Sequence, residues 1–304
     1  MQIMSLITAL PGAAAQGLIW GIMAIGVYIT FRILDIADLT VDGTLCTGGA
    51  VCIMMMLSGH NVWVSMLAAT LAGMLAGLAT GIFHTFMGIP AILAGILTQL
   101  SLYSVNLKIM GKANQAINVD KFNLLVSLRR VKGVALTQNT LFIVAIMIII
   151  LIAVLYWFFG TELGCSLRAT GCNPSMSRAQ GINTDRNKVL GLMLSNGLVA
   201  LSGALLTQYQ GFADINMGRG SIVIGLAAVI IGEAIFSRIF RNFALKLLSV
   251  VFGSILYYLV LQIVIWMGID TDLLKMLSAL VVAFFLAFPY WKGKYFTKAK
   301  QGGK

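Results

Sequence analysis

Charged side chains are scarce in this chain: of its 304 residues, only 10% are Asp, Glu, Lys or Arg. A soluble domain carries about 25%, and so few charges do not form a water-exposed shell. Hydrophobic residues make up 59% of the sequence, and the mean hydropathy is +0.94. Lipid must therefore cover much of the surface, which excludes an ordinary soluble protein and predicts an integral membrane protein.

Histidine is also rare, with only His60 and His84 in the sequence. A membrane hydrolase or metalloprotease needs clustered His, Asp or Glu side chains, and two separated histidines do not supply them. The sequence also lacks the G-x-x-x-x-G-K-S/T pattern, whose backbone cradles phosphate groups in ATPases. We therefore expect no catalytic residue, no metal ligand and no cofactor in this chain.

Long apolar runs dominate what is present. A membrane-spanning helix needs about 20 mostly apolar residues. The runs of this kind are 13–31, 39–57, 62–83, 90–107, 139–160, 188–210, 219–236, 245–267 and 273–291. They predict an all-α polytopic bundle of about nine spans (eight to ten), with 1–304 forming a single transmembrane domain. The seventh run is the shortest, and it has the length of a broken or re-entrant helix.

The positive charges predict the orientation of the spans. The net charge is +11, and in a membrane protein lysine and arginine gather at the cytoplasmic ends of spans, so we expect no nucleic-acid partner. A cytoplasmic C-terminus and nine spans place most of the 21 basic residues inside and the N-terminus outside. The basic segment 108–138 is the exception, because this orientation places it outside.

Span three carries a row of small residues at helical spacing. Gly73, Gly77 and Gly81 form a G-x-x-x-G-x-x-x-G pattern. Such a row lets two helices approach closely. It predicts helix packing and contains no information about a substrate.

The segment 164–187 is polar and lies between two strong spans on the predicted cytoplasmic side. Asn173-Pro174 marks a turn, and proline suits the first turn of a helix. A short helix over 175–180 would end at Gly181. A surface helix of this kind fits a groove on a cytoplasmic partner, although an ordinary basic loop is the plainer interpretation.

Several blocks of the sequence, taken together, resemble a known family of permeases. The runs RATGCNP at 168–174 and AQGINT at 179–184 are similar to the coupling-helix region of permeases in the branched-chain amino acid and ribose importer superfamily. The start of the chain resembles that superfamily too, with AIGVY at 24–28 and DLTVDG at 38–43. Blocks within 88–107 and 191–233 narrow the resemblance to the branch with tryptophan and tyrosine importers.

The resemblance implies an importer of the ATP-binding-cassette type in the bacterial cytoplasmic membrane. Two copies of the permease would work with two cytoplasmic ATPase subunits, which hold the ATP and Mg, and with an extracytoplasmic binding protein that delivers the substrate. The implied substrate is a small solute, most simply an aromatic amino acid. The coupling residues implied for this chain are Arg168, Ala169, Thr170, Gly171, Asn173, Pro174, Ala179 and Gly181.

Acidic residues near the spans have more than one interpretation each, because a charge at membrane depth is costly and often functional. Glu233 ends span seven, where it would pair with Arg238 or Arg241 or contact substrate. Three aspartates at the start of span two would cap a helix, pair with Arg32 or chelate a cation. They are Asp35, Asp38 and Asp42.

Neutral polar residues in the spans are candidates for the translocation path. They are Gln99, Asn106, Asn196, Gln208 and Tyr209. Such groups line a path or form hydrogen bonds between helices, and the sequence alone leaves both open. A stand-alone secondary transporter or channel is the alternative function. It would need its own coupling-ion site, usually with buried carboxylates, and the outer halves of the spans contain few acids.

Overall fold

The structure of the chain is a computed structural model. It describes residues 2–119, 122, 124–131, 139–236, 240, 242–267 and isolated positions between 273 and 287. The elements are α1 (Gln2–Tyr28), the π-helical η1 (Ile29–Ile33), α2 (Val41–Leu57), α3 (Val62–Thr85), α4 (Ala91–Met110), β1 (Asn114–Ala116), the 3-10 helix η2 (Leu128–Val131), α5 (Thr140–Gly160), α6 (Glu162–Cys172), α7 (Pro174–Ala179), α8 (Thr184–Gln210), β2 (Phe212–Asp214), α9 (Ser221–Phe236) and α10 (Phe243–Trp266).

The first eight predicted spans each coincide with a helix, and the ninth, 273–291, lies largely outside the described residues. Six helices are long and apolar enough to cross a membrane by length and composition. The two shorter apolar helices are α2 and α9, and α9, with 16 residues, falls short of the ~20 that a full crossing needs. The protein is thus a helical membrane protein with several spans, while the total of nine and the N-outside orientation remain predictions.

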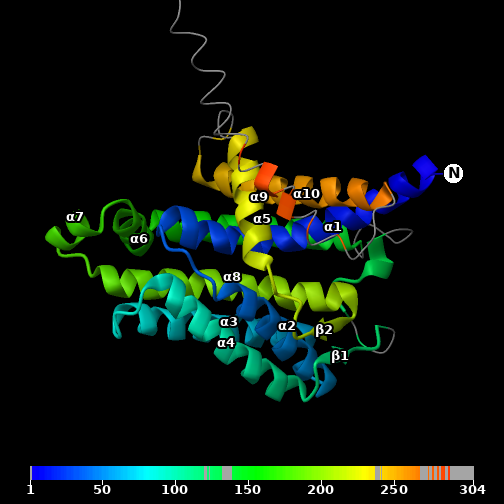
Figure 1. Cartoon of the computed structure of the whole chain (residues 1–304), viewed down its shortest axis with the longest axis horizontal. Helices are drawn as coiled ribbons and strands as arrows, with labels where there is room; N and C mark the ends of the chain where they lie inside the picture. Colours follow the sequence, from blue (N-terminus) through cyan, green and yellow to red (C-terminus); the bar gives the residue numbers. More distant parts are fainter. Residues whose placement is uncertain are drawn as a thin grey trace, which may run out of the picture.

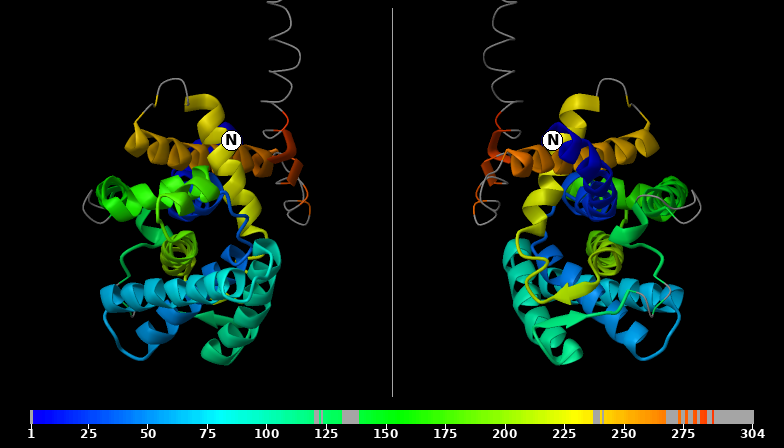
Figure 2. Two further views of the ribbon diagram at one scale, coloured as in Figure 1. Left: turned by 90° about the vertical axis from the view of Figure 1, so that its left-hand side faces the viewer. Right: turned by 90° about the vertical axis from the view of Figure 1, so that its right-hand side faces the viewer.

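The helix α8 lies at the centre of the bundle. Helices α2 and α3, with α4 beyond, cover one side of it, and α1, with α9 and α10 beyond, covers the other (Figures 1 and 2). Most of α8 is buried, as is most of α1, whereas α5 exposes most of its apolar surface. The α1–α8 pair therefore forms the core, and α5 is a peripheral helix that faces lipid.

The glycine row of α3 packs against α8, as its spacing predicts. A Cβ atom at Gly73 would collide with Ala200, one at Gly77 with the carbonyl of Leu192, and one at Gly81 would crowd Val189. The two helices run in opposite directions, because the C-terminal glycine of the row meets the N-terminal part of α8. Close backbone contact of this kind is how small residues hold membrane helices together.

The link between η1 and α2 folds back into the bundle. Asp35 has a φ of 56°, a left-handed conformation that aspartate tolerates better than most residues. After this turn, Asp38 and Thr44 both bond to Asn196, near the middle of α8. Helix α2 therefore begins beside the centre of α8 rather than at the end of the bundle.

Two links form a small sheet at the end of the bundle opposite α6 and α7 (Figure 1). Strand β1 pairs antiparallel with β2, with Asn114 opposite Asp214 and Ala116 opposite Phe212. The backbone N–H of Leu125 also donates to Gln208 at 3.2 Å. The described part of the basic segment 108–138 and the loop after α8 thus lie at the same end of the protein.

Candidate functional site

A short helix closes the polar segment between α5 and α8. Asn173 is extended, with φ −155° and ψ 95°, and its side-chain oxygen accepts a hydrogen bond from the backbone N–H of Met176 at 3.0 Å. Pro174 occupies the first turn, and Gly181 follows the helix with a φ of 79°. These are the start and stop signals that the sequence predicts, and the predicted short helix is confirmed as α7.

Helix α7 presents nearly all of its side chains to the outside. Within it, Ser177 is the one buried residue, and Met176 is 61% exposed. Arg178 anchors the helix to α8, because its Nε donates to the hydroxyl of Thr184 at 2.8 Å and its guanidinium lies 3.7 Å from Asp185. The result is a short helix that is anchored to α8 through Arg178 and has an exposed outer face.

Helix α6 connects α7 to the membrane helices, and its helical structure was not predicted from the sequence. Its buried face contains Leu167 and Thr170, and the hydroxyl of Thr170 accepts a hydrogen bond from Asn187 of α8 at 2.9 Å. Arg168 donates to the carbonyl of Phe159 at 2.9 Å. A Cβ at Gly171 would collide with the carbonyl of Ile33. Helix α6 therefore rests directly on η1.

The predicted coupling residues fall into two groups. The first group, on α6, faces the membrane helices or lies beside them: Arg168, Ala169, Thr170 and Gly171. The second group is exposed at the tip of the segment: Asn173, Pro174, Ala179 and Gly181. One end of the segment is thus free to contact another molecule, and the other end contacts η1, α5 and α8.

A chain of buried polar side chains crosses the centre of the bundle. Asn196 of α8 donates to Asp38 at 2.7 Å and accepts from the hydroxyl of Thr44 at 2.7 Å. The backbone N–H of Thr40 donates to Asp38 at 2.9 Å, and the hydroxyls of Thr40 and Thr80 lie 2.7 Å apart. All five residues are at most 2% exposed, so the chain of polar side chains is sealed within the protein.

This chain continues to α4 through a hydrogen bond from Thr80 to Thr98 at 2.9 Å. It joins α2, α3, α4 and α8 to the link before α2. Of its members, only Asp38 and Asn196 were predicted from the sequence to be candidate site residues. The threonines were missed, although hydroxyls at 40, 44, 80 and 98 within apolar runs were the available signal. Among the described residues, no three His, Cys, Asp or Glu side chains gather to hold a metal ion.

Three of the other path candidates form hydrogen bonds to other elements of the same chain. Asn106 donates to the carbonyl of Gly43 at 3.3 Å. Gln208 accepts from Leu125, as described above, and the hydroxyl of Tyr209 donates to the carbonyl of Gly12 at 3.1 Å. These three side chains are buried, whereas Gln99 on α4 is only half-buried.

Glu233 has a partner other than those expected for it. Glu233 pairs with Arg32, at 2.9 Å between the carboxylate and Nε, so the expected pairing of Arg32 with the aspartates is wrong. The other proposed partners of Glu233, Arg238 and Arg241, lie outside the described residues.

Asp42 binds the start of α9 rather than its own helix. Its carboxylate accepts hydrogen bonds from the backbone N–H groups of Gly220 and Ile222 and from the hydroxyl of Ser221, each at 2.9 Å. Asp38, described above, joins the buried polar chain, and Asp35 is exposed at the turn after η1. The three aspartates therefore lie at three separate positions in the structure and do not form one cluster.

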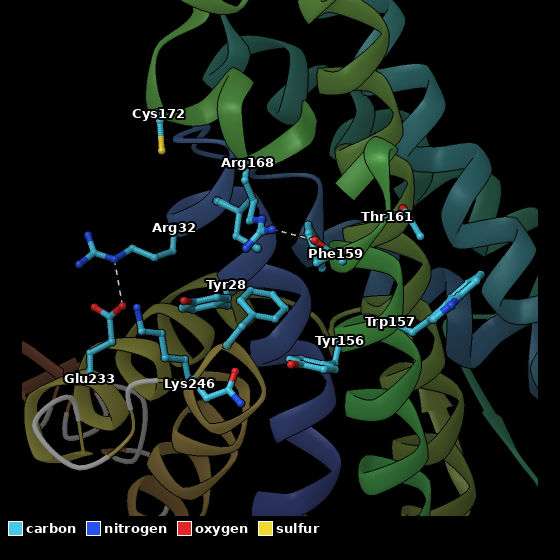
Figure 3. A pocket seen from close by; sticks show the side chains of 14 residues that line it. Tyr28, Arg32, Tyr156, Trp157, Phe159, Thr161, Arg168, Cys172, Glu233 and Lys246 are labelled. Atoms are coloured by element: carbon cyan, nitrogen blue, oxygen red, sulfur yellow. Dashed lines mark hydrogen bonds and ion pairs between the residues drawn. The ribbon is translucent and has the colours of Figure 1, made fainter. Parts of the chain in front are cut away.

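A cavity of about 930 Å³ lies beneath α6, bordered by η1, α5, α9 and α10. Figure 3 shows the Arg32–Glu233 pair and Lys246 together on one side of it, with Arg168 reaching in from α6. Aromatic side chains of Tyr28, Tyr156, Phe159 and Phe243 also line it.

Comparison with known proteins identifies the family. The family model described as the permease component of branched-chain amino acid transport systems matches residues 10–286. A tyrosine transport system permease protein of Clostridioides difficile is 39% identical over 272 residues, which are 90% of this chain and 88% of the relative. A fructose import permease protein of Bifidobacterium longum is 25% identical, over 81% of this chain and 67% of the relative.

A solved structure shares the fold. PsaBC from Streptococcus pneumoniae, in complex with Fab, superposes with a TM-score of 0.56 and 17% identity, covering 98% of this chain and 99% of that one. The family match over most of the chain, together with the apolar helices, places the protein in the bacterial cytoplasmic membrane. The chain belongs to the branched-chain amino acid transport system permease family, whose members are the membrane-embedded transport subunits of ATP-binding-cassette systems.

Proposed function

We propose that this chain is the permease subunit of an importer for an amino acid, most simply an aromatic one such as tyrosine or tryptophan. The tyrosine transport permease of Clostridioides difficile, which matches almost the whole chain, supports this substrate class. ATP hydrolysis takes place in a separate ATPase, and a binding protein outside the membrane delivers the substrate. Two copies of the chain form the translocation path between them.

The observation that carries the proposal is the geometry of α6 and α7. Helix α7 is exposed except at Ser177, and the preceding helix α6 packs against η1 at Gly171. A short exposed helix fits a groove on a partner protein. When the ATPase closes, a displacement of α7 passes through α6 to η1 and α5, because no space separates Gly171 from Ile33.

The basic residues near α6 and α7 support the orientation that we propose. Arg168, Arg178, Arg186 and Lys188 lie in and around α6 and α7, and such residues favour the cytoplasmic side. The ATPase therefore contacts the α7 end. The β1–β2 end, with the N-terminus, then faces outward and receives the binding protein.

Among the path candidates, we assign Gln99 to the translocation path and the others to packing. Gln99 is the one that is not fully buried within a single chain. Asn196, Gln208, Tyr209 and Asn106 each bond to another element of the same chain. A side chain that lines a path between two copies must remain accessible in one copy.

Co-purification tests the ATPase contact directly. Met176→Glu places a charge on the exposed face of α7 and should abolish co-purification of the partner ATPase, with the thermal unfolding temperature unchanged. Met87→Glu is the matched control, because Met87 is 58% exposed in the link between α3 and α4 at the same end of the bundle. Equal recovery of the ATPase with both variants would contradict the assignment of α7.

A further inference from the structure

We propose that the cavity beneath α6 binds the phosphate headgroup of an anionic phospholipid, with an acyl chain lying along α5. This function is separate from transport and from ATPase docking. It assigns a ligand to the cavity that Figure 3 shows, which the polar chain at the centre of the bundle does not reach.

The charge of the cavity is complementary to a phosphate. Arg32, Arg168 and Lys246 line it, and Glu233 is the single acid among the lining residues. One nitrogen of Arg32 is engaged by Glu233, and the guanidinium has further N–H donors in a fork suited to phosphate oxygens. Three cations against one carboxylate leave an excess of positive charge, and basic pockets between membrane helices bind acidic lipid headgroups.

The depth of the cavity also matches a headgroup. Helix α5 is apolar throughout and ends at Gly160, whereas α6 begins with Glu162 and is polar. Tyr156 and Trp157, in the last turns of α5, are 49% and 71% exposed, and such aromatic residues mark the boundary between the membrane and water. The cavity lies at this boundary, because the last residues of α5 line it.

An exposed apolar row leads from the cavity toward the middle of the membrane. Ile149, Ala153, Tyr156 and Gly160 are all exposed and recur at helical spacing on α5. Tyr156 and Gly160 also line the cavity. A lipid bound by its phosphate at the cavity can therefore lay an acyl chain along this row. A soluble anion has no hydrocarbon chain to pack against this apolar row, which favours a lipid as the occupant.

Native mass spectrometry of the purified full chain in detergent tests the proposal. Phosphatidylglycerol and phosphatidylcholine are added in separate series to the wild type, to Lys246→Gln and to Arg186→Gln. Arg186 is exposed at the same end of the bundle and does not line the cavity, so its variant makes the same change of charge elsewhere. Lys246→Arg keeps the charge and is the conservative variant.

We expect the wild type to retain phosphatidylglycerol in preference to phosphatidylcholine. Loss of one basic residue in Lys246→Gln should weaken the retention of phosphatidylglycerol by about fivefold, while Arg186→Gln and Lys246→Arg retain it. Equal retention of the two lipids, or equal losses in Lys246→Gln and Arg186→Gln, would overturn the proposal. Displacement of phosphatidylglycerol by millimolar inorganic phosphate would also overturn it, because the site would then bind a soluble anion.

Discussion

Gly171 of α6 lies directly against the carbonyl of Ile33, the last residue of η1, with no room between them for a Cβ atom. This contact joins the exposed helix α7 to the first membrane helix. From the adjacent Arg32, an ion pair leads to Glu233 on α9. The α6–η1 contact therefore connects the proposed ATPase surface to two membrane helices that lie far apart in the sequence.

Gly171→Ala should separate α6 from η1. The added methyl group overfills the contact, which costs about 1–3 kcal/mol of stability, and it should lower ATP-driven transport more than ATP hydrolysis. Gly160→Ala is the control, because a Cβ at Gly160 would meet nothing within 4 Å. The measurements are thermal unfolding and the ratio of transport to hydrolysis. Unchanged values for Gly171→Ala would show that the contact is not tight.

An exchange of Asp38 and Asn196 tests the buried polar chain. Asn196→Asp alone brings two buried carboxylates into contact in place of a 2.7 Å hydrogen bond, and we expect it to cost about 3 kcal/mol or more. The double variant Asp38→Asn with Asn196→Asp restores one donor and one acceptor, so it should recover most of the loss. Chemical unfolding of the single and double variants gives the coupling energy. A double variant as unstable as the sum of its single variants would contradict the contact.

Hydropathy predicts which segments form the helices of the bundle. It does not predict how far inside the bundle each helix begins. The apolar runs at 62–83 and 139–160 correspond closely to α3 and α5, since a long run of apolar residues has no other stable place than a spanning helix. The fold-back before α2 depends on the turn at Asp35 and on the bond from Asp38 to a residue 158 positions away. No local pattern contains such a contact.

Asp42 should be essential for the start of α9. Its carboxylate caps the helix with three hydrogen bonds, and loss of a capping side chain costs about 0.5–2 kcal/mol. Asp42→Ala should therefore lower the unfolding temperature, and Asp42→Asn should do so less. Asp35→Asn, at an exposed position that tolerates the same turn, should have little effect. Equal effects of Asp42→Asn and Asp35→Asn would indicate that net charge, not capping, is responsible.

The pair of Arg32 and Glu233 should contribute little to stability despite its short distance. The side chains are 58% and 29% exposed, and solvent-exposed pairs contribute about 0–1 kcal/mol. Glu233→Gln and Arg32→Gln should each change the free energy of unfolding by less than about 1 kcal/mol. A double-variant cycle with chemical unfolding measures the coupling between them. A coupling energy well above this range would contradict the expectation, because it would mean that the ion pair is buried away from water.

The candidate site was partly predictable, for a physical reason. The start and stop of α7 follow from Asn173, Pro174 and Gly181, because capping is a local property of the sequence. The partner of Glu233 was not predictable, because it belongs to a helix 201 residues earlier. The polar chain was missed for the same reason, since a threonine in an apolar run shows its bonding partner only after the helices have packed.

Uptake into proteoliposomes tests the central claim most directly. The chain is reconstituted with the partner ATPase that we propose, with the substrate-binding protein loaded with radiolabelled tyrosine on one side and ATP on the other. We predict uptake that requires ATP, the ATPase and the binding protein, and that Met176→Glu abolishes but Met87→Glu preserves. Uptake driven by an ion gradient, by this chain alone without an ATPase, would contradict the account and favour a secondary transporter.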